Sequence, residues 1–118
     1  MIETIQDARA ALEAQGLFVS VNNPFSLLIG SCVVDAEEGL RLFQDACSLN
    51  RRAGQWIASF PVEGHCLYEL PGSLPELVSV ISRIYGQYRR AGGPFKDAFR
   101  VVVSDPNQYL VGSSPARV

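Results

Sequence analysis

The sequence predicts a single α+β domain in which helices pack against a mainly antiparallel sheet. Stretches with helical spacing lie near both ends of the chain and once in between, whereas the strand-like stretches come in adjacent pairs joined by turns. The length of 118 residues and the apolar content of 47% suit one hydrophobic core. We expect the order α-β-β-α-β-β-α-α, with residues 1–112 forming the domain and residues 113–118 a frayed tail.

The chain is predicted to begin with a helix and two strands. Apolar residues recur every three or four positions over Glu3–Gln15, and Gly16 follows as a stop signal, which together indicate a helix. Strands are expected over Leu17–Val21 and Phe25–Val34. Within the second strand, Gly30-Ser31 marks a bulge or a break.

One part of this region needs a test against a membrane span. The segment Ala14–Val34 contains no charged residue and is long enough to cross a bilayer. Its Asn22-Asn23-Pro24 sequence is a turn signal, however, and unpaired amides in the middle of a membrane are costly. We therefore expect two buried strands joined by a turn.

The middle of the chain is predicted to hold a helix followed by a β-hairpin. Asp35 is followed three residues later by a glutamate, which is the spacing of a capping box, and this predicts a helix over Asp35–Leu49. The hairpin is expected over Gln55–Phe60 and Cys66–Leu70, with Gly64 at a positive φ in its turn. Alternation along the two strands predicts the buried side of the hairpin, formed by Trp56, Ala58, Phe60, Cys66, Tyr68 and Leu70.

The C-terminal part is predicted to be helical. Ser73–Glu76 is the clearest helix start, because Ser73 can cap the first turn and a proline and a glutamate follow at suitable positions. An apolar stripe continues to Gly92-Gly93, which ends this helix. A shorter helix begins at Pro94, although the three valines at 101–103 also permit a strand, and a final turn is expected over 105–110.

Charge limits the classes of partner. The net charge of −2 gives no general attraction to phosphate backbones or anionic membranes, so neither nucleic acid nor a membrane is an expected direct partner. The charge is uneven, with seven acids against two arginines in residues 1–50 and five acids against eight bases in residues 51–118. Two interpretations are open: an acidic face that steers a basic protein partner, or ordinary solvated helix faces.

No catalytic, metal or cofactor site is predicted. Cys32, Cys47 and Cys66 cannot all pair within the chain and form no C-x-x-C, and the start Met-Ile-Glu-Thr lacks a secretory signal, which favours a reducing cytoplasm. One isolated histidine and scattered cysteines do not suit a zinc site. His65 and Cys66 are neighbours, but strand alternation points them apart and no third group orients them. A small enzyme that uses His65 or Cys66 stays an alternative to a protein without catalytic activity.

The stretch from Gln55 to Gly112 resembles small bacterial immunity proteins, which are encoded beside contact-dependent growth-inhibition and other polymorphic toxins. The pattern that carries the resemblance comprises Trp56–His65, Tyr68–Gly72, Leu77–Ser79, Tyr85, Tyr88-Arg89, Gly92-Gly93, Ser104-Asp105 and Gln108–Leu110. The resemblance implies a cytoplasmic antitoxin that neutralises a cognate toxin domain by tight, non-covalent binding. It covers about half of the chain and assigns no individual binding residue.

The expected contact surface follows from the acidic first half. A basic toxin, for example a nuclease, would suit the acidic group Asp35, Glu37, Glu38 and Asp45, with Glu63 and His65 in the hairpin turn as the second choice. The alternative function is a small interaction or chaperone-like module, whose exposed aromatic residues or hairpin edge bind an endogenous partner or form a homodimer.

Overall fold

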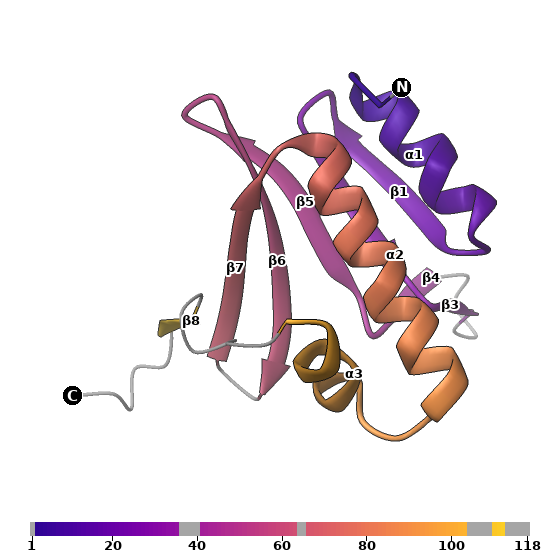
Figure 1. Ribbon diagram of the computed structural model, residues 1–118. Coiled ribbons are helices and arrows are strands. Elements are labelled where there is room, and N and C mark those ends of the chain that lie inside the picture. Colours follow the sequence, from indigo (N-terminus) through magenta and orange to yellow (C-terminus); the bar gives the residue numbers. More distant parts are fainter. Residues whose placement is uncertain (1, 36–40, 64–65, 104–109, 113–118) are drawn as a thin grey trace.

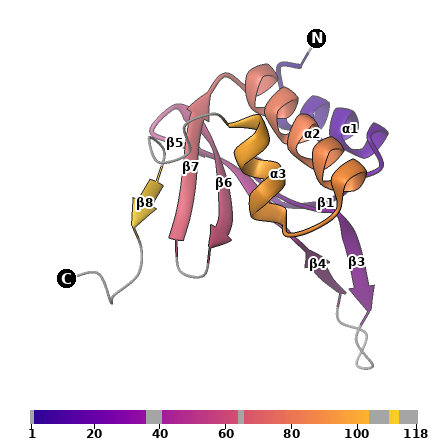
Figure 2. The ribbon, with the colours of Figure 1, turned by 60° about the horizontal axis from the view of Figure 1, so that its bottom comes forward.

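Three helices cover one face of a six-stranded antiparallel sheet, and no described helix covers the other face (Figures 1 and 2). The computed structural model describes residues 2–35, 41–63, 66–103 and 110–112. The order of strands in the sheet is β1-β2-β5-β6-β7-β8, while β3 and β4 pair separately. All of these pairings are antiparallel, which confirms the predicted α+β class and the mainly antiparallel sheet.

The elements lie in the following order along the chain: α1 (Ile5–Ala14), β1 (Phe18–Asn23), β2 (Ser26–Gly30), β3 (Cys32–Asp35), β4 (Arg41–Gln44), β5 (Cys47–Arg52), β6 (Gln55–Glu63), β7 (Cys66–Gly72), α2 (Leu74–Ala91), α3 (Phe95–Val102) and β8 (Leu110–Gly112).

The first helix and the strands of the charge-free segment form as predicted, but β1 is only partly buried, since Phe18 and Val21 are exposed. Thr4 caps α1: its hydroxyl accepts from the amide of Asp7 at 3.2 Å, and the Asp7 carboxylate accepts from the amide of Thr4 at 3.1 Å. The segment Ala14–Val34 then forms the β1–β2 hairpin and enters β3, with the expected break at Ser31. Among the described residues, no helix is both long and apolar enough to cross a membrane.

The predicted helix over Asp35–Leu49 is wrong, and with it the predicted order of elements. Asp35 ends β3, and β4 and the start of β5 occupy the described part of the remaining range. Cys47 and Leu49 are buried and Ser48 between them is half-buried, which is the alternation of a strand. The same two apolar residues had also fitted the apolar stripe of a helix. Because β5 pairs with both β2 and β6, its backbone hydrogen bonds and burial outweigh the local capping signal.

The C-terminal half follows the prediction more closely. Ser73 and Glu76 form the expected capping box at the start of α2, which ends at Gly92 with φ 69°. Val101 and Val102 belong to α3, so the strand alternative is wrong there. The expected final turn lies largely outside the described residues, but Leu110 is in β8, paired with Tyr68, and is not helical.

The hairpin of β6 and β7 and the helices share the core. Ala58, Phe60 and Tyr68 are buried as predicted, and the ring of Phe99 on α3 lies 5.1 Å from the rings of both Phe60 and Tyr68, measured between centroids. The helices therefore pack on aromatic side chains of the sheet. Tilted ring contacts of this kind stabilise the fold beyond the burial of the rings alone.

A buried hydroxyl group attaches α2 to the sheet. Tyr85 donates its phenolic proton to the main-chain carbonyl of Asp45 at 2.5 Å, and the same hydroxyl lies 3.3 Å from the carbonyl of Ile29. It also shares a hydrogen bond with the thiol of Cys47. One side chain thus joins α2 to β2, to β5 and to the turn that precedes β5.

Replacing Tyr85 with Phe is expected to lower the free energy of unfolding by about 1–3 kcal/mol, because buried carbonyl groups lose their donor. Tyr68→Phe is the matched control: this tyrosine is equally buried, but its hydroxyl makes no hydrogen bond within the described part of the chain. Its loss should stay below about 0.5 kcal/mol. Urea unfolding at pH 7 measures both, and equal losses would contradict the proposed role of the Tyr85 hydroxyl.

Candidate functional site

Of the residues predicted to bind a partner, Asp45 alone has a described side chain. Asp35 is the last residue of β3 and Glu63 the last of β6, while Glu37, Glu38 and His65 lie outside the described residues. Asp45 occupies the turn before β5 at φ 50°, and its carboxylate accepts a hydrogen bond from the Tyr88 hydroxyl. Its carboxylate therefore contributes to the fold, and its role in partner binding stays a prediction.

The thiol beside this turn is held in its neutral form. Cys47 is fully buried, and burial raises the pKa of its thiol to about 12. Burial, followed by the neighbouring Cys47, also raises the pKa of the Tyr85 hydroxyl well above its ordinary value. Neither group is a nucleophile near neutral pH, because the reactive form of each is the anion.

These raised pKa values predict a loss of stability in alkali. The pKa of a cysteine in an unfolded chain is about 8.5. Above about pH 9 the unfolded chain therefore loses a proton that the folded Cys47 keeps. The free energy of unfolding then falls by up to about 1.4 kcal/mol per pH unit. Cys47→Ala should show a shallower fall between pH 9 and 11. Urea unfolding of both proteins over this range is the test, and parallel curves would contradict the assignment.

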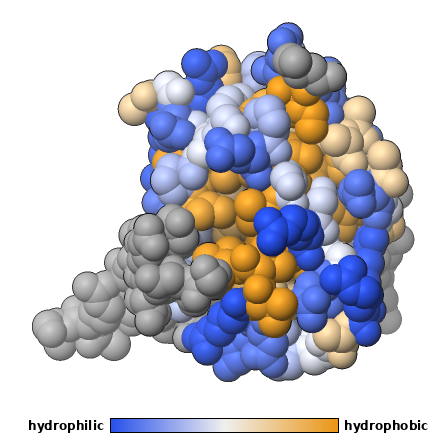
Figure 3. Space-filling model, viewed as in Figure 1, coloured by the Kyte–Doolittle hydropathy of each residue, from blue (hydrophilic) through white to orange (hydrophobic). Residues whose placement is uncertain are grey.

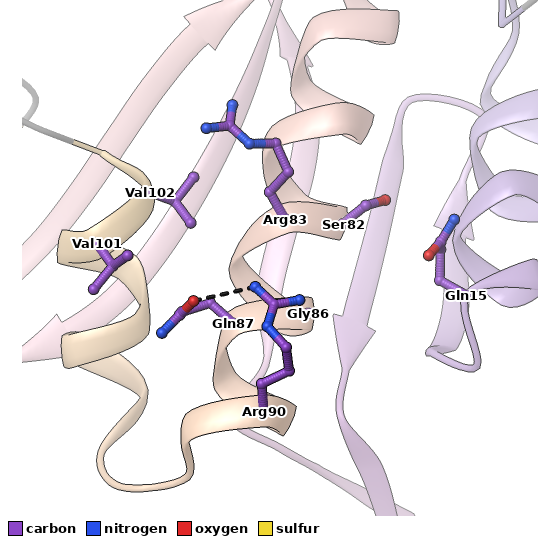
Figure 4. A pocket seen from close by; sticks show the side chains of 8 residues that line it. All are labelled: Gln15, Ser82, Arg83, Gly86, Gln87, Arg90, Val101 and Val102. Carbon is purple, nitrogen blue, oxygen red and sulfur yellow. Dashed lines mark hydrogen bonds between the residues drawn. The ribbon is translucent and has the colours of Figure 1, made fainter.

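The described surface carries an open groove across α2, which we call the α2–α3 groove (Figure 4). Its volume is about 460 Å³. The lining comprises Gln15 after α1, Ser82, Arg83, Gly86, Gln87 and Arg90 on α2, and Val101 and Val102 on α3. Apolar and strongly polar patches lie side by side on this helical face of the molecule (Figure 3).

The groove exists because α2 presents a polar stripe on its outer side. Arg83, Gly86 and Arg90 recur every three or four positions and so lie along one side of the helix, opposite its buried stripe. Gly86 has no side chain, which lowers the helix surface between the two arginines. In Figure 4 Gln87 extends from α2 toward Val101, and it accepts a hydrogen bond from Arg90 at 3.2 Å.

The far wall of the groove is fixed by a third arginine. Arg89 donates to the main-chain carbonyls of Gln15 at 2.6 Å and Gly16 at 2.8 Å, and so binds the C-terminal end of α1. Gly16 has φ 84°, and a Cβ atom there would lie 3.3 Å from the Arg89 guanidinium. Glycine is therefore the residue that this close contact requires.

Arg83 and Arg90 give the groove its positive charge. No carboxylate within the described ranges forms an ion pair with either guanidinium. The side chain of Val101 beside them is 65% exposed. Guanidinium groups without an ion-pair partner of their own, next to exposed apolar surface, can bind carboxylates of another molecule and bury its apolar groups.

The groove was not predicted from the sequence. Neither Arg83 nor Arg90 was among the residues predicted to bind a partner. The polar stripe of Arg83, Gly86 and Arg90 was a usable signal, but the contributions of Gln15 and Val101 depend on how three helices pack. In addition, the described residues contain no cluster of three or more His, Cys, Asp or Glu side chains that could hold a metal ion.

No protein family, curated protein or solved structure matches this chain. The resemblance of residues 55–112 to immunity proteins therefore stays a prediction.

Gly86→Ala is expected to raise the free energy of unfolding by about 0.5–1 kcal/mol, because glycine inside a helix is less stable than alanine by that amount. The added Cβ atom has room, since its nearest neighbour is the Arg90 guanidinium at 3.5 Å. Thermal and urea unfolding measure the change. A loss of stability would mean that the fold itself requires glycine at position 86. The presence of Gly86 would then give no support to a binding role for the groove.

Proposed function

We propose that the protein is an immunity protein that neutralises a toxin domain by tight, non-covalent binding, and that the α2–α3 groove forms part of the contact surface. The observation that carries this proposal is the pair Arg83 and Arg90, two guanidinium groups without an ion-pair partner in the described residues, beside the exposed Val101. Arginine is enriched at protein interfaces because it combines a fixed set of donors with an apolar stem.

The groove also predicts the chemistry of the partner. Carboxylates on the toxin would pair with Arg83 and Arg90, and an apolar side chain would cover Val101. Complementary charge accelerates association, and ion pairs that lose water on binding slow dissociation. Apart from Gln15, all groove residues lie within the stretch 55–112 that resembles immunity proteins.

The acidic group remains the second proposed contact surface. Asp35, Glu37, Glu38 and Asp45, together with Glu63 and His65, would suit a basic toxin such as a nuclease. The two surfaces make opposite demands on the charge of the partner, so charge reversal on each distinguishes between them.

One observation favours the alternative of a small interaction or chaperone-like module. The side chains of Phe18 and Phe25 are 45% and 53% exposed, at the start of β1 and in the turn after it. Exposed aromatic groups can bind an endogenous protein or a second copy of the chain. This alternative predicts a molecular mass in solution that rises with concentration.

The test is co-expression with the C-terminal domain encoded by the gene immediately upstream. We expect that domain to stop growth alone, and this protein to restore growth through a stable complex. Arg83→Glu and Arg90→Glu should each weaken the complex about 10–100-fold, because each places a carboxylate against a carboxylate. Arg9→Glu is the matched control, since Arg9 is an exposed arginine outside the groove.

The outcomes separate the proposals. If the upstream domain is not toxic and no complex forms, the immunity function is wrong. If a complex forms but only lysine substitutions at Glu37, Glu38 and Asp45 weaken it, the acidic group is the contact surface and the groove is not.

A further inference from the structure

Strand β1 leaves one edge of the sheet without a partner. Within the described residues β1 pairs with β2 alone, so its other side is an edge of the sheet (Figure 1). Natural proteins often protect such an edge with charged side chains or proline, because its free main-chain groups can pair with another chain. The sequence of β1, Phe18–Asn23, contains neither a charged residue nor a proline.

The hydrogen bonds of β2 define which of its main-chain groups face β1. The amide of Arg51 donates to the carbonyl of Phe25 at 3.0 Å, and this pair continues the antiparallel register of β2 with β5. In an antiparallel ladder, each strand directs the main-chain groups of successive residues to opposite sides. Phe25 and the second residue after it, Leu27, therefore bond toward β5, and Leu28 bonds toward β1.

The same alternation leaves two valines of β1 with unpaired main-chain groups. Leu28 is opposite Ser20, so Ser20 bonds toward β2. Its neighbours Val19 and Val21 therefore direct their N–H and C=O groups to the free edge, where no described group forms a hydrogen bond with them. The side chain of Val21 is 37% exposed, and that of Phe18 at the start of the strand is 45% exposed. The edge thus combines unpaired main-chain groups with exposed apolar side chains.

We propose that two copies of the chain form a dimer by antiparallel pairing of β1 with β1, about a twofold axis beside Ser20. In this register Val19 of each copy exchanges both main-chain hydrogen bonds with Val21 of the other copy. The valine side chains meet on the helix-covered side, where the residues opposite them in β2, Ile29 and Leu27, are buried. Ser20 meets the same serine of the second copy on the open side of the sheet.

A second copy is the partner that matches this edge. Valine beside valine places apolar groups together on one face, and serine opposite serine places hydroxyl groups together on the other. The segment Ala14–Val34 contains no charged residue, so it brings no like charges together at the axis. Head-to-tail pairing of β1 with β8 would build an open fibre, but β8 has only three residues, whereas two β1 strands of six residues form a closed pair.

The dimer goes beyond the proposed function and does not rest on toxin binding. It uses none of the residues that line the α2–α3 groove, so an immunity protein can form it as readily as an interaction module. Rescue of growth by co-expression tests the function, whereas the mass in solution tests the dimer.

Sedimentation equilibrium of the full chain, from micromolar to millimolar concentrations, is the first test. We expect a mass that rises toward that of two chains. Hydrogen exchange identifies the edge: the amides of Val19 and Val21 should exchange fast in dilute protein and more slowly as the dimer forms, whereas β2 protects the Ser20 amide at every concentration. A monomer throughout the range, or a dimer without added protection of the two valine amides, overturns the proposal; the monomer would leave the edge free for a strand of another protein.

Charge at Ser20 tests the twofold axis. Ser20→Lys and Ser20→Glu should each weaken the dimer at least about tenfold, because each places two like charges directly opposite one another. An equal mixture of the two variants should associate again, since opposite charges then face each other. Ser79→Lys is the matched control, because Ser79 is an exposed serine on α2, outside β1, and it should leave the dimer unchanged.

Val21→Pro tests the main-chain hydrogen bonds. It removes an N–H group that no described residue uses, and edge strands tolerate proline. We expect the dimer to weaken about tenfold or more, because the bond is lost in both copies. The amide spectrum of each variant in dilute solution verifies that it folds. A mixture of the two Ser20 variants that fails to associate, or a dimer that neither Ser20→Lys nor Val21→Pro weakens, overturns the proposal. No toxin is used, so failure here leaves the immunity function unaffected.

Discussion

The position of α2 on the sheet depends on the hydroxyl group of Tyr85. Its bonds to the carbonyl of Asp45 and to the Cys47 thiol connect the helix with the turn before β5, and Tyr88, about one helical turn further along, donates to the Asp45 carboxylate. Hydrophobic contact alone would allow a helix to slide or rotate over an apolar face, because it has no preferred direction. Buried hydrogen bonds select one arrangement, and the loss of a partner leaves polar groups unsatisfied. The outer side of α2 is fixed by the same contacts, and with it the groove.

The fold was predictable where local signals and tertiary packing agree. Thr4 and Ser73 begin helices that bury an apolar stripe, and Gly92 ends the second one, so sequence pattern and packing select the same element. The range Asp35–Leu49 shows the opposite case. Cys47 and Leu49 fit a helical stripe and also a strand, and the outcome was decided by pairing of β5 with β2 and β6. Such pairing joins distant parts of the chain and leaves no local signal.

The candidate sites were less predictable than the fold. The acidic charge of the first half predicted a partner surface that includes Asp45, but in the structure the Asp45 carboxylate accepts a hydrogen bond from Tyr88. An acid that serves the fold and an acid that serves binding look identical in sequence. The arginines raise the same ambiguity: Arg89 caps α1, whereas its neighbour Arg90 faces the groove. Adjacent residues on a helix differ by about 100° in direction, so their roles depend on which neighbouring element each direction meets.

The α2–α3 groove uses a surface whose side chains are not needed for the core. On α2 the buried stripe of Leu77, Ile81 and Ile84 binds the sheet, so the outer residues can change to match a partner without loss of packing. The open sheet face offers the same freedom, since its side chains alternate with the buried ones. Strand β5 connects both regions, because it begins beside the Tyr85 contact and ends at Arg51 and Arg52. It pairs with β2 on one side and with β6 on the other, so backbone hydrogen bonds on both edges fix the strand on which the two faces of the sheet are built.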